Sequence, residues 1–421
     1  MSRLHVAVIG AGIIGLSAAY HLTRSGLRVT VVDSDPEGDK ASIGNAGGIA
    51  VTEILPAAAV VTPWRVLRWM MDPLGPLAVR PIHALKMMPW LRGFAQIGSP
   101  VVVARITQAL AALNSRVYKD LLPMLAETNL ASELHRLGAL SVYESGTGFG
   151  QDAAEWDCKR ANGIEAQAIS GDEARALEPA LGPRVHCAVF TPQWSHVSDP
   201  KRILRGLKCW VSSHGVDIAQ GCVRDVGVSP STLSLRLGDR HIEADRVVVA
   251  AGAWSGGLAR GLGDRVLLES ERGYNMTIAR PGIQVTRELI FAERKFVATP
   301  LHCGLRIGGA AEFGGLAAAP NFKRSRKLAL LAQRYLPNLA VEDGVCWAGH
   351  RPTTPDSLPV IGPSARDERV LYAFGHGHLG LTLAATTGRL VTDLVVGAST
   401  GIDMAPYRVE RFDRRQREIP R

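Results

Sequence analysis

The stretch HVAVIGAGIIGLSAAYHL, residues 5–22, decides the fold of this chain. It opens with a β-branched apolar run, passes three closely spaced glycines, and continues as a helical pattern with apolar residues on one face. A second apolar run, VTVVD, follows at 29–33 and ends in Asp33. Strand, glycine turn, helix and strand in this order predict an α/β protein with a βαβ unit of the Rossmann type.

The glycine turn predicts a dinucleotide site. Gly10 permits the tight turn, Gly12 lets backbone N–H groups approach a pyrophosphate, and Gly15 lets the helix pack closely on the strand. The pyrophosphate then lies at the positive end of the helix. Asp33 is placed to bind the adenosine ribose. The alternative is that the glycines only close a packed turn, and the motif does not separate NAD from FAD.

Two further glycine-rich segments are candidates for the same cofactor. KASIGNAGGIA, residues 40–50, is either a second backbone approach to the cofactor or an ordinary loop. AFGHGHLG, residues 373–380, repeats the glycine spacing of the N-terminal turn, but no strand ending in an acid follows, because Asp393 falls inside a helical stripe. We therefore expect this turn to present the N-terminus of a helix beginning near Leu379 to the same cofactor rather than to bind a second nucleotide.

The composition of the chain restricts the classes of protein to which it can belong. With 421 residues, 46% hydrophobic and 21% charged, the chain fits two globular domains or one domain with a large insertion. Six cysteines without CxxC spacing predict neither a metal site nor a disulfide framework, and the N-terminus lacks signal-peptide features, so we expect a cytoplasmic protein. The net charge of +9 is partly in the C-terminal RVERFDRRQREIPR. Without a basic stripe interleaved with aromatics, nucleic-acid binding is not favoured.

Four stretches in order along the chain resemble the D-amino-acid oxidase superfamily of FAD-dependent oxidoreductases, and within it bacterial D-amino-acid dehydrogenases. They are VIGAGIIGLSAAYHL with Asp33, ASIGNAGGIAV, RVVVAAGAWS, and GHRPTTPDSLPVIG followed by GHGHLGLTLAATTGRLVTDL. The resemblance implies a Rossmann-type FAD-binding domain with an inserted α+β substrate domain. We expect the FAD-binding domain in 1–55, 196–265 and 345–421, and the substrate domain in 56–195, largely helical, and 266–344, largely β.

The motifs and the resemblance together give the expected FAD contacts. These are Gly10, Gly12, Ile14, Gly15, Asp33, Ser34, Ser42, Asn45, Gly47, Gly48, Ile49, Val223, Ala251, Gly252, Trp254, Gly377, His378, Leu379, Gly380 and Leu381. Val223 is expected in a strand on the adenine side, and His378 at the pyrimidine edge of the flavin. Trp254 is either near the phosphates or a core residue.

Four residues are expected to act on the substrate. Arg351 matches the arginine that binds the substrate carboxylate in the relatives, and its alternative is a structural pair with Asp356. Tyr274 matches a tyrosine that hydrogen-bonds the same carboxylate, or is a half-buried strand residue. Glu53 is expected to meet the substrate ammonium or a hydroxyl. His196 either faces the substrate or is a hydrogen-bonded surface residue.

The resemblance implies oxidation of a D-amino acid to a 2-oxo acid, with the flavin taking the hydride from Cα. A cyclic substrate such as D-proline or D-hydroxyproline is one expectation. A segment with Trp64, Trp69, Met70, Met71 and Trp90 favours a quinone-linked acceptor and peripheral contact with the cytoplasmic face of the inner membrane, or forms the core of the substrate domain. The alternatives are a glycine- or sarcosine-type oxidase that uses oxygen, and a non-catalytic nucleotide-binding sensor.

Overall fold

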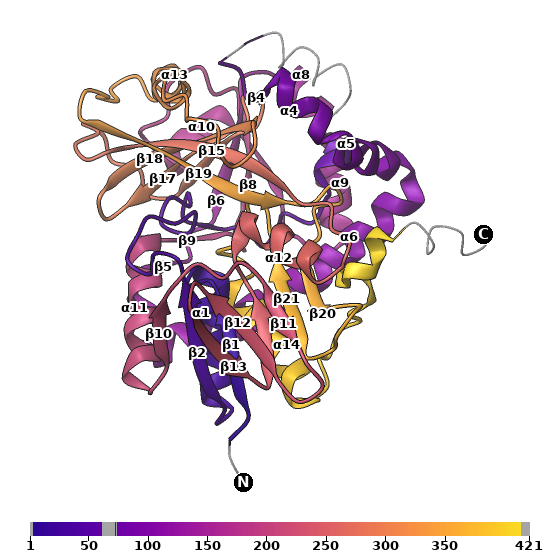
Figure 1. The fold of residues 1–421 in the computed structure, drawn as a ribbon. Coiled ribbons are helices and arrows are strands. Elements are labelled where there is room, and N and C mark those ends of the chain that lie inside the picture. The colour runs from indigo at the N-terminus through magenta and orange to yellow at the C-terminus, as the bar shows by residue number, and fades with distance from the viewer. Residues whose placement is uncertain (1–2, 61–71, 73, 414–421) are drawn as a thin grey trace.

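The computed structural model describes residues 3–60, 72 and 74–413. Two large β-sheets organise the chain (Figure 1): a six-stranded sheet in the lower half of the view and a nine-stranded sheet in the upper half. Trp64, Trp69, Met70 and Met71 lie outside the described residues, as do residues 414–421 of the basic tail.

The six-stranded sheet is built around the N-terminal βαβ unit. Its order is β10 (Asp217–Gln220), β2 (Arg28–Asp33), β1 (His5–Ile9), β14 (Arg246–Val249), β21 (Val370–Phe374) and β20 (Val360–Pro363). All neighbours are parallel except β20, which pairs antiparallel with β21. The predicted α/β fold with a parallel Rossmann-type sheet is confirmed.

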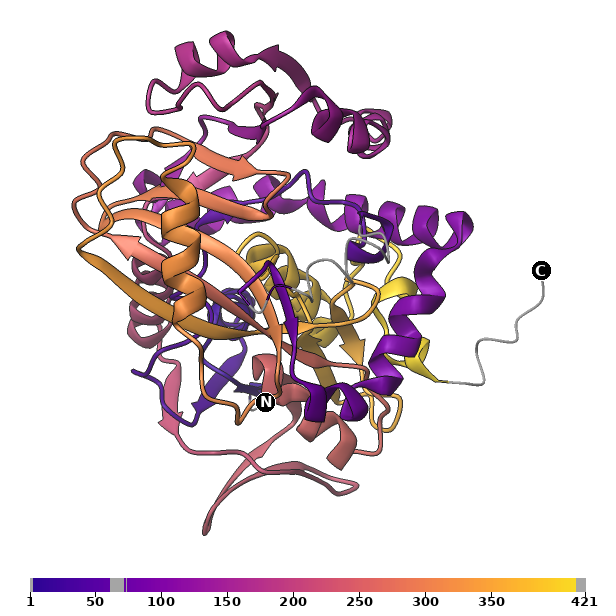
Figure 2. The same ribbon diagram turned by 90° about the horizontal axis from the view of Figure 1, so that it is seen from above.

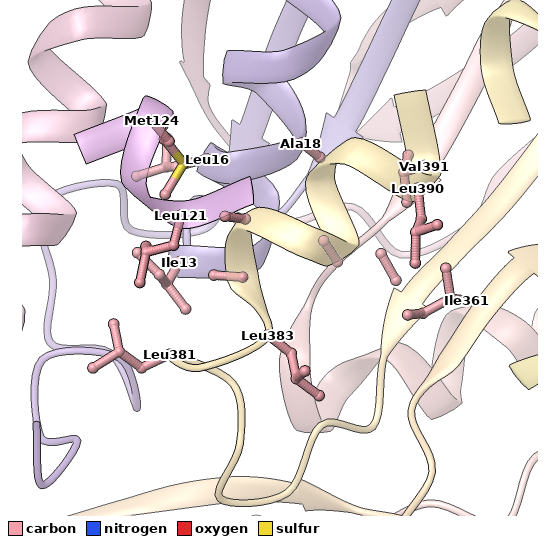
Figure 3. Close-up of a cluster of buried hydrophobic side chains, with 14 of the residues drawn as sticks. Ile13, Leu16, Ala18, Leu121, Met124, Ile361, Leu381, Leu383, Leu390 and Val391 are labelled. Carbon is pink, nitrogen blue, oxygen red and sulfur yellow. The ribbon is translucent and has the colours of Figure 1, made fainter. Parts of the chain in front are cut away.

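Three helices pack together beside this sheet. They are α1 (Ile13–Arg24), α7 (Val117–Glu127) and α14 (Ala384–Val396). Figure 3 shows Leu16 of α1, Leu121 of α7 and Leu390 of α14 in one buried cluster. A Cβ on Gly388 would lie 2.5 Å from the carbonyl oxygen of Ser17, so only glycine lets α1 and α14 approach to backbone contact.

The nine-stranded sheet draws its strands from distant parts of the chain. Its order is β19 (Gly344–Thr353), β15 (Glu269–Ile278), β18 (Gly304–Phe313), β17 (Phe296–Leu301), β16 (Glu288–Phe291), β6 (Ala139–Tyr143), β8 (Cys187–Thr191) and β7 (Gln167–Ser170), with β4 (Leu77–Val79) also pairing β18. The range 56–195 thus contributes strands as well as helices. Strand β19 belongs to this sheet, although we expected the FAD-binding segment to begin at 345; its ten residues pair in continuous register with β15.

The remaining elements cover these sheets. They are α2 (Ala57–Val60), α4 (Pro81–Lys86), α5 (Met88–Ala95), α6 (Pro100–Asn114), α8 (Gly146–Gln151), α9 (Ala153–Ala161), α10 (Gly171–Leu177), α11 (Pro200–Ser213), α12 (Ser255–Gly261) and α13 (Lys323–Ala332). Two small sheets are added: β3 (Gly48–Ile49), β9 (Ser195–Val197) and β5 (Leu134–His135); and β11 (Val226–Val228), β12 (Leu233–Leu237) and β13 (Arg240–Ala244). Seen from above, α5 and α6 lie beside the large sheet (Figure 2).

Several prolines of the 56–135 region begin helices instead of breaking them. Pro81 and Pro100 occupy the first turns of α4 and α6, where a missing N–H costs nothing. Trp90 of α5 is buried, and its Nε1–H donates to the carbonyl oxygen of Thr353 at 3.0 Å, so this tryptophan belongs to the core and not to a membrane-facing surface. No helix among the described residues is long and apolar enough to cross a membrane.

Candidate active site

The N-terminal turn requires glycine at two positions for steric reasons. Gly10 has φ of +111°, and a Cβ there would lie 2.4 Å from the carbonyl oxygen of Ala250. A Cβ on Gly15 would lie 1.9 Å from the carbonyl oxygen of Gly10. Helix α1 then begins at Ile13, whose N–H donates to Ser42 Oγ at 3.0 Å. The turn is therefore as tight as a pyrophosphate site needs.

Asp33 lies at the end of β2, where the sequence predicts it. Its Oδ2 accepts from the N–H of Ala11 at 2.6 Å, and its Oδ1 accepts from Lys40 Nζ at 3.0 Å and from the N–H of Asp35 at 2.9 Å. A carboxylate has about four acceptor sites. The carboxylate is thus fixed in place and retains capacity for about one further hydrogen bond.

A cavity of about 1240 Å³ runs from this turn to the edge of the nine-stranded sheet. It exceeds the roughly 300–1,000 Å³ typical of sites for drug-sized ligands, as a dinucleotide with a second small molecule requires. The predicted residues that line it are Gly10, Gly12, Ile14, Asp33, Ser34, Ser42, Asn45, Gly48, Glu53, Val223, Ala251, Gly252, Trp254, Tyr274, Arg351, Gly377, His378, Gly380 and Leu381. Gly15, Gly47, Ile49, Leu379 and His196 are not in this lining.

His196 is the expected substrate residue that the structure places elsewhere. It sits on β9, where it pairs in register with Gly48, and its side chain is buried. Its ring stacks on that of His135 with 5.1 Å between centroids. Burial lowers the pKa of His196 to about 4. His196 lies outside the cavity lining because β9 is the central strand of the small sheet β3–β9–β5.

The structure differs in detail from three other expectations. Val223 lies in the coil after β10 rather than in a strand. Trp254 is 57% exposed, so it is not a core residue, and its ring meets His350 edge to face. The helix expected near Leu379 begins instead at Ala384, because residues 377–383 form turns and Gly377 has φ of +54°.

The 40–50 loop is held by the nine-stranded sheet. Asn275 Nδ2 donates to the carbonyl oxygen of Gly44 at 2.7 Å. Arg306 Nη1 donates to the carbonyl oxygens of Ile43 at 3.0 Å and Asn45 at 2.5 Å. Sequence reasoning missed both side chains, since nothing near residues 275 and 306 indicates a partner more than two hundred residues earlier.

Arg351 lies at the far end of the cavity, on β19. It is the direct cross-strand neighbour of Glu271 on β15, and its Nη1 donates to Glu271 Oε1 at 2.8 Å. A Cβ on Gly273 would lie 2.5 Å from Arg351 Cζ, so the guanidinium occupies the space that a glycine leaves open. Asp356 instead binds Arg411, at 2.8 Å. The alternative pairing of Arg351 with Asp356 is therefore wrong, and the residue that sequence reasoning missed is Glu271.

Tyr274 lines the cavity, but its hydroxyl is already engaged. It donates to Glu312 and accepts from the N–H of Asn321 at 3.0 Å. Burial, together with Glu312, raises the pKa of Tyr274. The hydroxyl thus has its donor committed within the protein, which differs from the expected hydrogen bond to a substrate carboxylate.

Glu53 belongs to a charged cluster along the cavity wall. Lys159, itself buried, binds Glu53 at 3.0 Å and Glu155 at 2.9 Å, and lies over the ring of Trp156 at 4.7 Å. Burial works to raise the pKa of Glu53, but the charge of Lys159 and its hydrogen bond to Glu53 outweigh burial and leave this pKa below its usual value. Glu53 is therefore an anion facing the cavity.

Glu288 is a second carboxyl group that sequence reasoning missed. Its Oε2 accepts from Trp194 Nε1 at 2.8 Å, and a Cβ on Gly48 would lie 2.3 Å from that same oxygen. Burial raises the pKa of Glu288 to about 7. Nothing in the local sequence distinguishes this glutamate from a surface residue, because its burial arises from long-range packing.

A Rossmann-type sheet, a sterically demanding glycine turn and a long cavity lined by a half-buried arginine indicate a flavin- or nicotinamide-dependent oxidoreductase. A family model described as "FAD dependent oxidoreductase" matches residues 5–394, and the chain belongs to this family. Its cofactor is FAD. The residues present fit it, since a Cβ on Gly252 would meet nothing within 4 Å and one on Gly12 only Ser42 Oγ at 3.5 Å, which leaves room beside the turn.

Individual proteins resemble the chain over nearly its whole length. It is 34% identical to a D-amino-acid oxidase of Bradyrhizobium diazoefficiens, covering 97% of this chain and 99% of the relative. It is 31% identical to a D-amino acid dehydrogenase 2 of Ralstonia nicotianae, covering 97% and 100%. Among solved structures, glycine oxidase from Geobacillus kaustophilus superposes with a TM-score of 0.76 at 20% identity, covering 97% of this chain and 99% of the other, which shows the shared fold.

Proposed function

We propose that the chain oxidises D-amino acids to 2-oxo acids and passes the electrons from FAD to a quinone-linked acceptor. The observation that carries this proposal is Arg351, a half-buried cation in the same cavity as the dinucleotide turn. The relatives named D-amino-acid oxidase and D-amino acid dehydrogenase support the substrate class. The proposed substrates include a cyclic D-amino acid such as D-proline or D-hydroxyproline.

Arg351 has the free donors that carboxylate binding needs. Its Nη1 is bonded to Glu271 and, more weakly, to the carbonyl oxygen of Ala310 at 3.4 Å. Nε and Nη2 make no hydrogen bond within the described residues, and together they form the planar fork that binds a carboxylate bidentately. Glu271 holds the guanidinium in position, and its carboxylate adds a negative charge to the lining of the cavity.

The remaining residues supply binding and orientation. FAD, when bound, accepts the hydride from the substrate Cα. The backbone around Gly10, Gly12 and Ile14 would hold its pyrophosphate, and Asp33 its ribose. Arg351 would fix the substrate carboxylate and so orient Cα, which is the contribution that positioning makes to such reactions. Glu53 would attract the substrate ammonium.

The electron acceptor separates the proposal from its nearest alternative, an amino acid oxidase of the glycine or sarcosine type. Ile82 and Leu85 of α4 are 82% and 78% exposed, one helical turn apart, which supports contact with a membrane where a quinone would be met. An oxygen electrode compared with a soluble quinone analogue separates the two acceptors. Sedimentation with anionic vesicles tests the contact, which should fail in an Ile82→Glu, Leu85→Glu variant.

The test of the reaction is anaerobic addition of D-amino acids, sarcosine, glycine and L-proline to the holoprotein while flavin absorbance is followed. We expect D-amino acids to bleach the flavin fastest. Bleaching by 2-hydroxy acids alone would overturn the amine oxidation, and bleaching by nothing would favour a non-catalytic sensor. Arg351→Ala should keep FAD and lose affinity for carboxylate substrates by about 10²-fold or more, since a charged hydrogen bond contributes about 1.5–3 kcal/mol and Glu271 also loses its partner.

A further inference from the structure

His378 is a cavity residue whose imidazole is not hydrogen-bonded to any residue that the structure describes. It lies between β21 and α14, its side chain is exposed, and it lines the cavity. Within the described residues it makes no hydrogen bond or ion pair. His376, two positions earlier, is the opposite case, since it is buried and its Nε2 bonds Thr387 Oγ1 at 2.9 Å.

The loop that carries His378 is fixed to the strand that carries Arg351. The N–H of Gly377 donates to the carbonyl oxygen of Pro352 at 2.8 Å, and His376 forms a β-bridge with Thr353. Pro352 and Thr353 directly follow Arg351 in β19. These backbone contacts hold His378 and Arg351 at the same end of the cavity, so a substrate whose carboxylate binds Arg351 has its nitrogen near this loop.

Four charged side chains act on His378. Glu53 and Glu271 favour its protonated form, while Arg351 and Lys159 oppose it. Desolvation by the surrounding cavity is the largest influence, and it lowers the pKa of this otherwise exposed imidazole below its ordinary value. His376 is neutral at physiological pH, because burial lowers its pKa to about 3. Desolvation thus favours the unprotonated imidazole of His378, which faces the carboxylates of Glu53 and Glu271.

Amine oxidation needs the substrate nitrogen to be uncharged when the hydride leaves. An amino acid binds chiefly as an ammonium, and hydride can leave Cα only when the nitrogen lone pair is free to form the C=N bond. Resting on the proposed function, we propose that His378 accepts the ammonium proton of the bound substrate. The N–H bond breaks, its electron pair stays on nitrogen, and the proton moves to the imidazole. The hydride would then leave Cα with the C–H electron pair for bound FAD, the nitrogen lone pair would form the C=N bond, and the product would be an iminium cation.

The decisive comparison is the rate of anaerobic flavin bleaching by a D-amino acid in wild type and in His378→Gln, between pH 6 and the pH where the free substrate is an uncharged amine. At neutral pH we expect the variant to be slower by about 10²-fold, the usual contribution of a positioned base. The deficit should disappear as pH passes the pKa of the substrate ammonium. His350→Gln is the matched control, because His350 also lines the cavity but its Nδ1 is bonded to Ser270 Oγ at 2.6 Å. It should show no pH-dependent deficit.

A second readout does not depend on turnover. The affinity for benzoate, a carboxylate without an amine, followed by the flavin spectrum, should be unchanged in His378→Gln, as should the FAD content. A deficit of equal size at every pH, or a loss of benzoate or FAD affinity that accounts for it, would overturn the role of His378 and make it a flavin or packing contact. If wild type is bleached by no amine at any pH, the proposed function itself fails.

Discussion

Two glycine turns with the same spacing meet at one cavity, and they need glycine for different reasons. In the N-terminal turn, Cβ atoms on Gly10 and Gly15 would lie 2.4 Å and 1.9 Å from backbone oxygens. In the C-terminal turn, a Cβ on Gly375 would lie 2.9 Å from the side-chain methyl of Thr354, whereas those on Gly377 and Gly380 would have 3.8 Å and 3.9 Å of clearance. Gly377 instead needs a left-handed backbone, with φ of +54°.

The consequence of this difference is visible in the helices that follow. Helix α1 begins at Ile13, inside the glycine motif, whereas α14 begins at Ala384, beyond the last glycine of its turn. In the first turn, the absence of side chains on the glycines lets helix α1 pack closely on a strand. The second orients a loop that carries a histidine. Glycine spacing alone therefore does not identify a nucleotide site, and the steric environment of each glycine does.

The strongest test of the comparison is Gly15→Ala. The new methyl group would overlap the carbonyl oxygen of Gly10, which is backbone and cannot move aside without opening the turn. We expect a loss of at least about 3 kcal/mol in the free energy of unfolding, together with loss of FAD. Denaturant melts and the flavin absorbance of the purified protein measure both. Gly26→Ala is the control, because φ is +78° there but nothing lies within 4 Å; an equal loss in the control would contradict a steric cause.

The second prediction concerns the pH dependence of the unfolding free energy. Residues 10–15 contain no titratable side chain, whereas the C-terminal turn contains His376. Burial lowers the pKa of His376 to about 3, below the roughly 6.5 of an unfolded histidine. The unfolded chain therefore binds this proton first, so the stabilisation is complete above about pH 6.5 and is lost as pH falls toward 3. The free energy of unfolding of the wild type should decrease as pH falls from 7 to 4. We expect His376→Gln to reduce the slope of this decrease by at most about 1.4 kcal/mol per pH unit. Unchanged slopes in urea melts from pH 7 to 4 would contradict it.

A smaller effect is expected for Gly377→Ala. The side chain has room, and only the left-handed backbone is unfavourable, at about 1–2 kcal/mol. FAD should be retained. Thermal unfolding with and without added FAD measures the loss of stability. A loss as large as that of Gly15→Ala would show that the two turns require glycine for the same reason.

The smallest effect is expected for Gly380→Ala. Its φ is not in the left-handed region, and the nearest atom to a new Cβ is that of His376 at 3.9 Å. The change should alter the unfolding free energy by less than about 1 kcal/mol, with a gain in stability allowed by the lower entropy of the unfolded chain. The same melts on the FAD-free protein provide the measurement, and a clear destabilisation would show that the loop is packed more tightly than the structure indicates.

Local signals made the N-terminal half of the site predictable. Residues 5–33 contain their own strands, helix and turn, so Gly10, Gly12 and Asp33 follow from the sequence. The partner of Arg351 does not, because Glu271 meets it only through the register of β15 with β19. Asn275, Arg306 and Glu288 were missed for the same reason. His196 was misplaced because a short strand in a small sheet has no periodicity from which burial can be inferred.

The hydrogen bonds from Asn275 and Arg306 to the 40–50 loop connect the two halves of the molecule thermodynamically. This loop leaves the nucleotide sheet and is anchored by side chains of the other sheet, so a ligand that orders the loop also stabilises β15 and β18. Ligand binding adds its free energy to every element that must be native for binding to occur. Cofactor loading should therefore protect amides of both sheets from hydrogen exchange, and the chain should behave as one cooperative unit once FAD is bound.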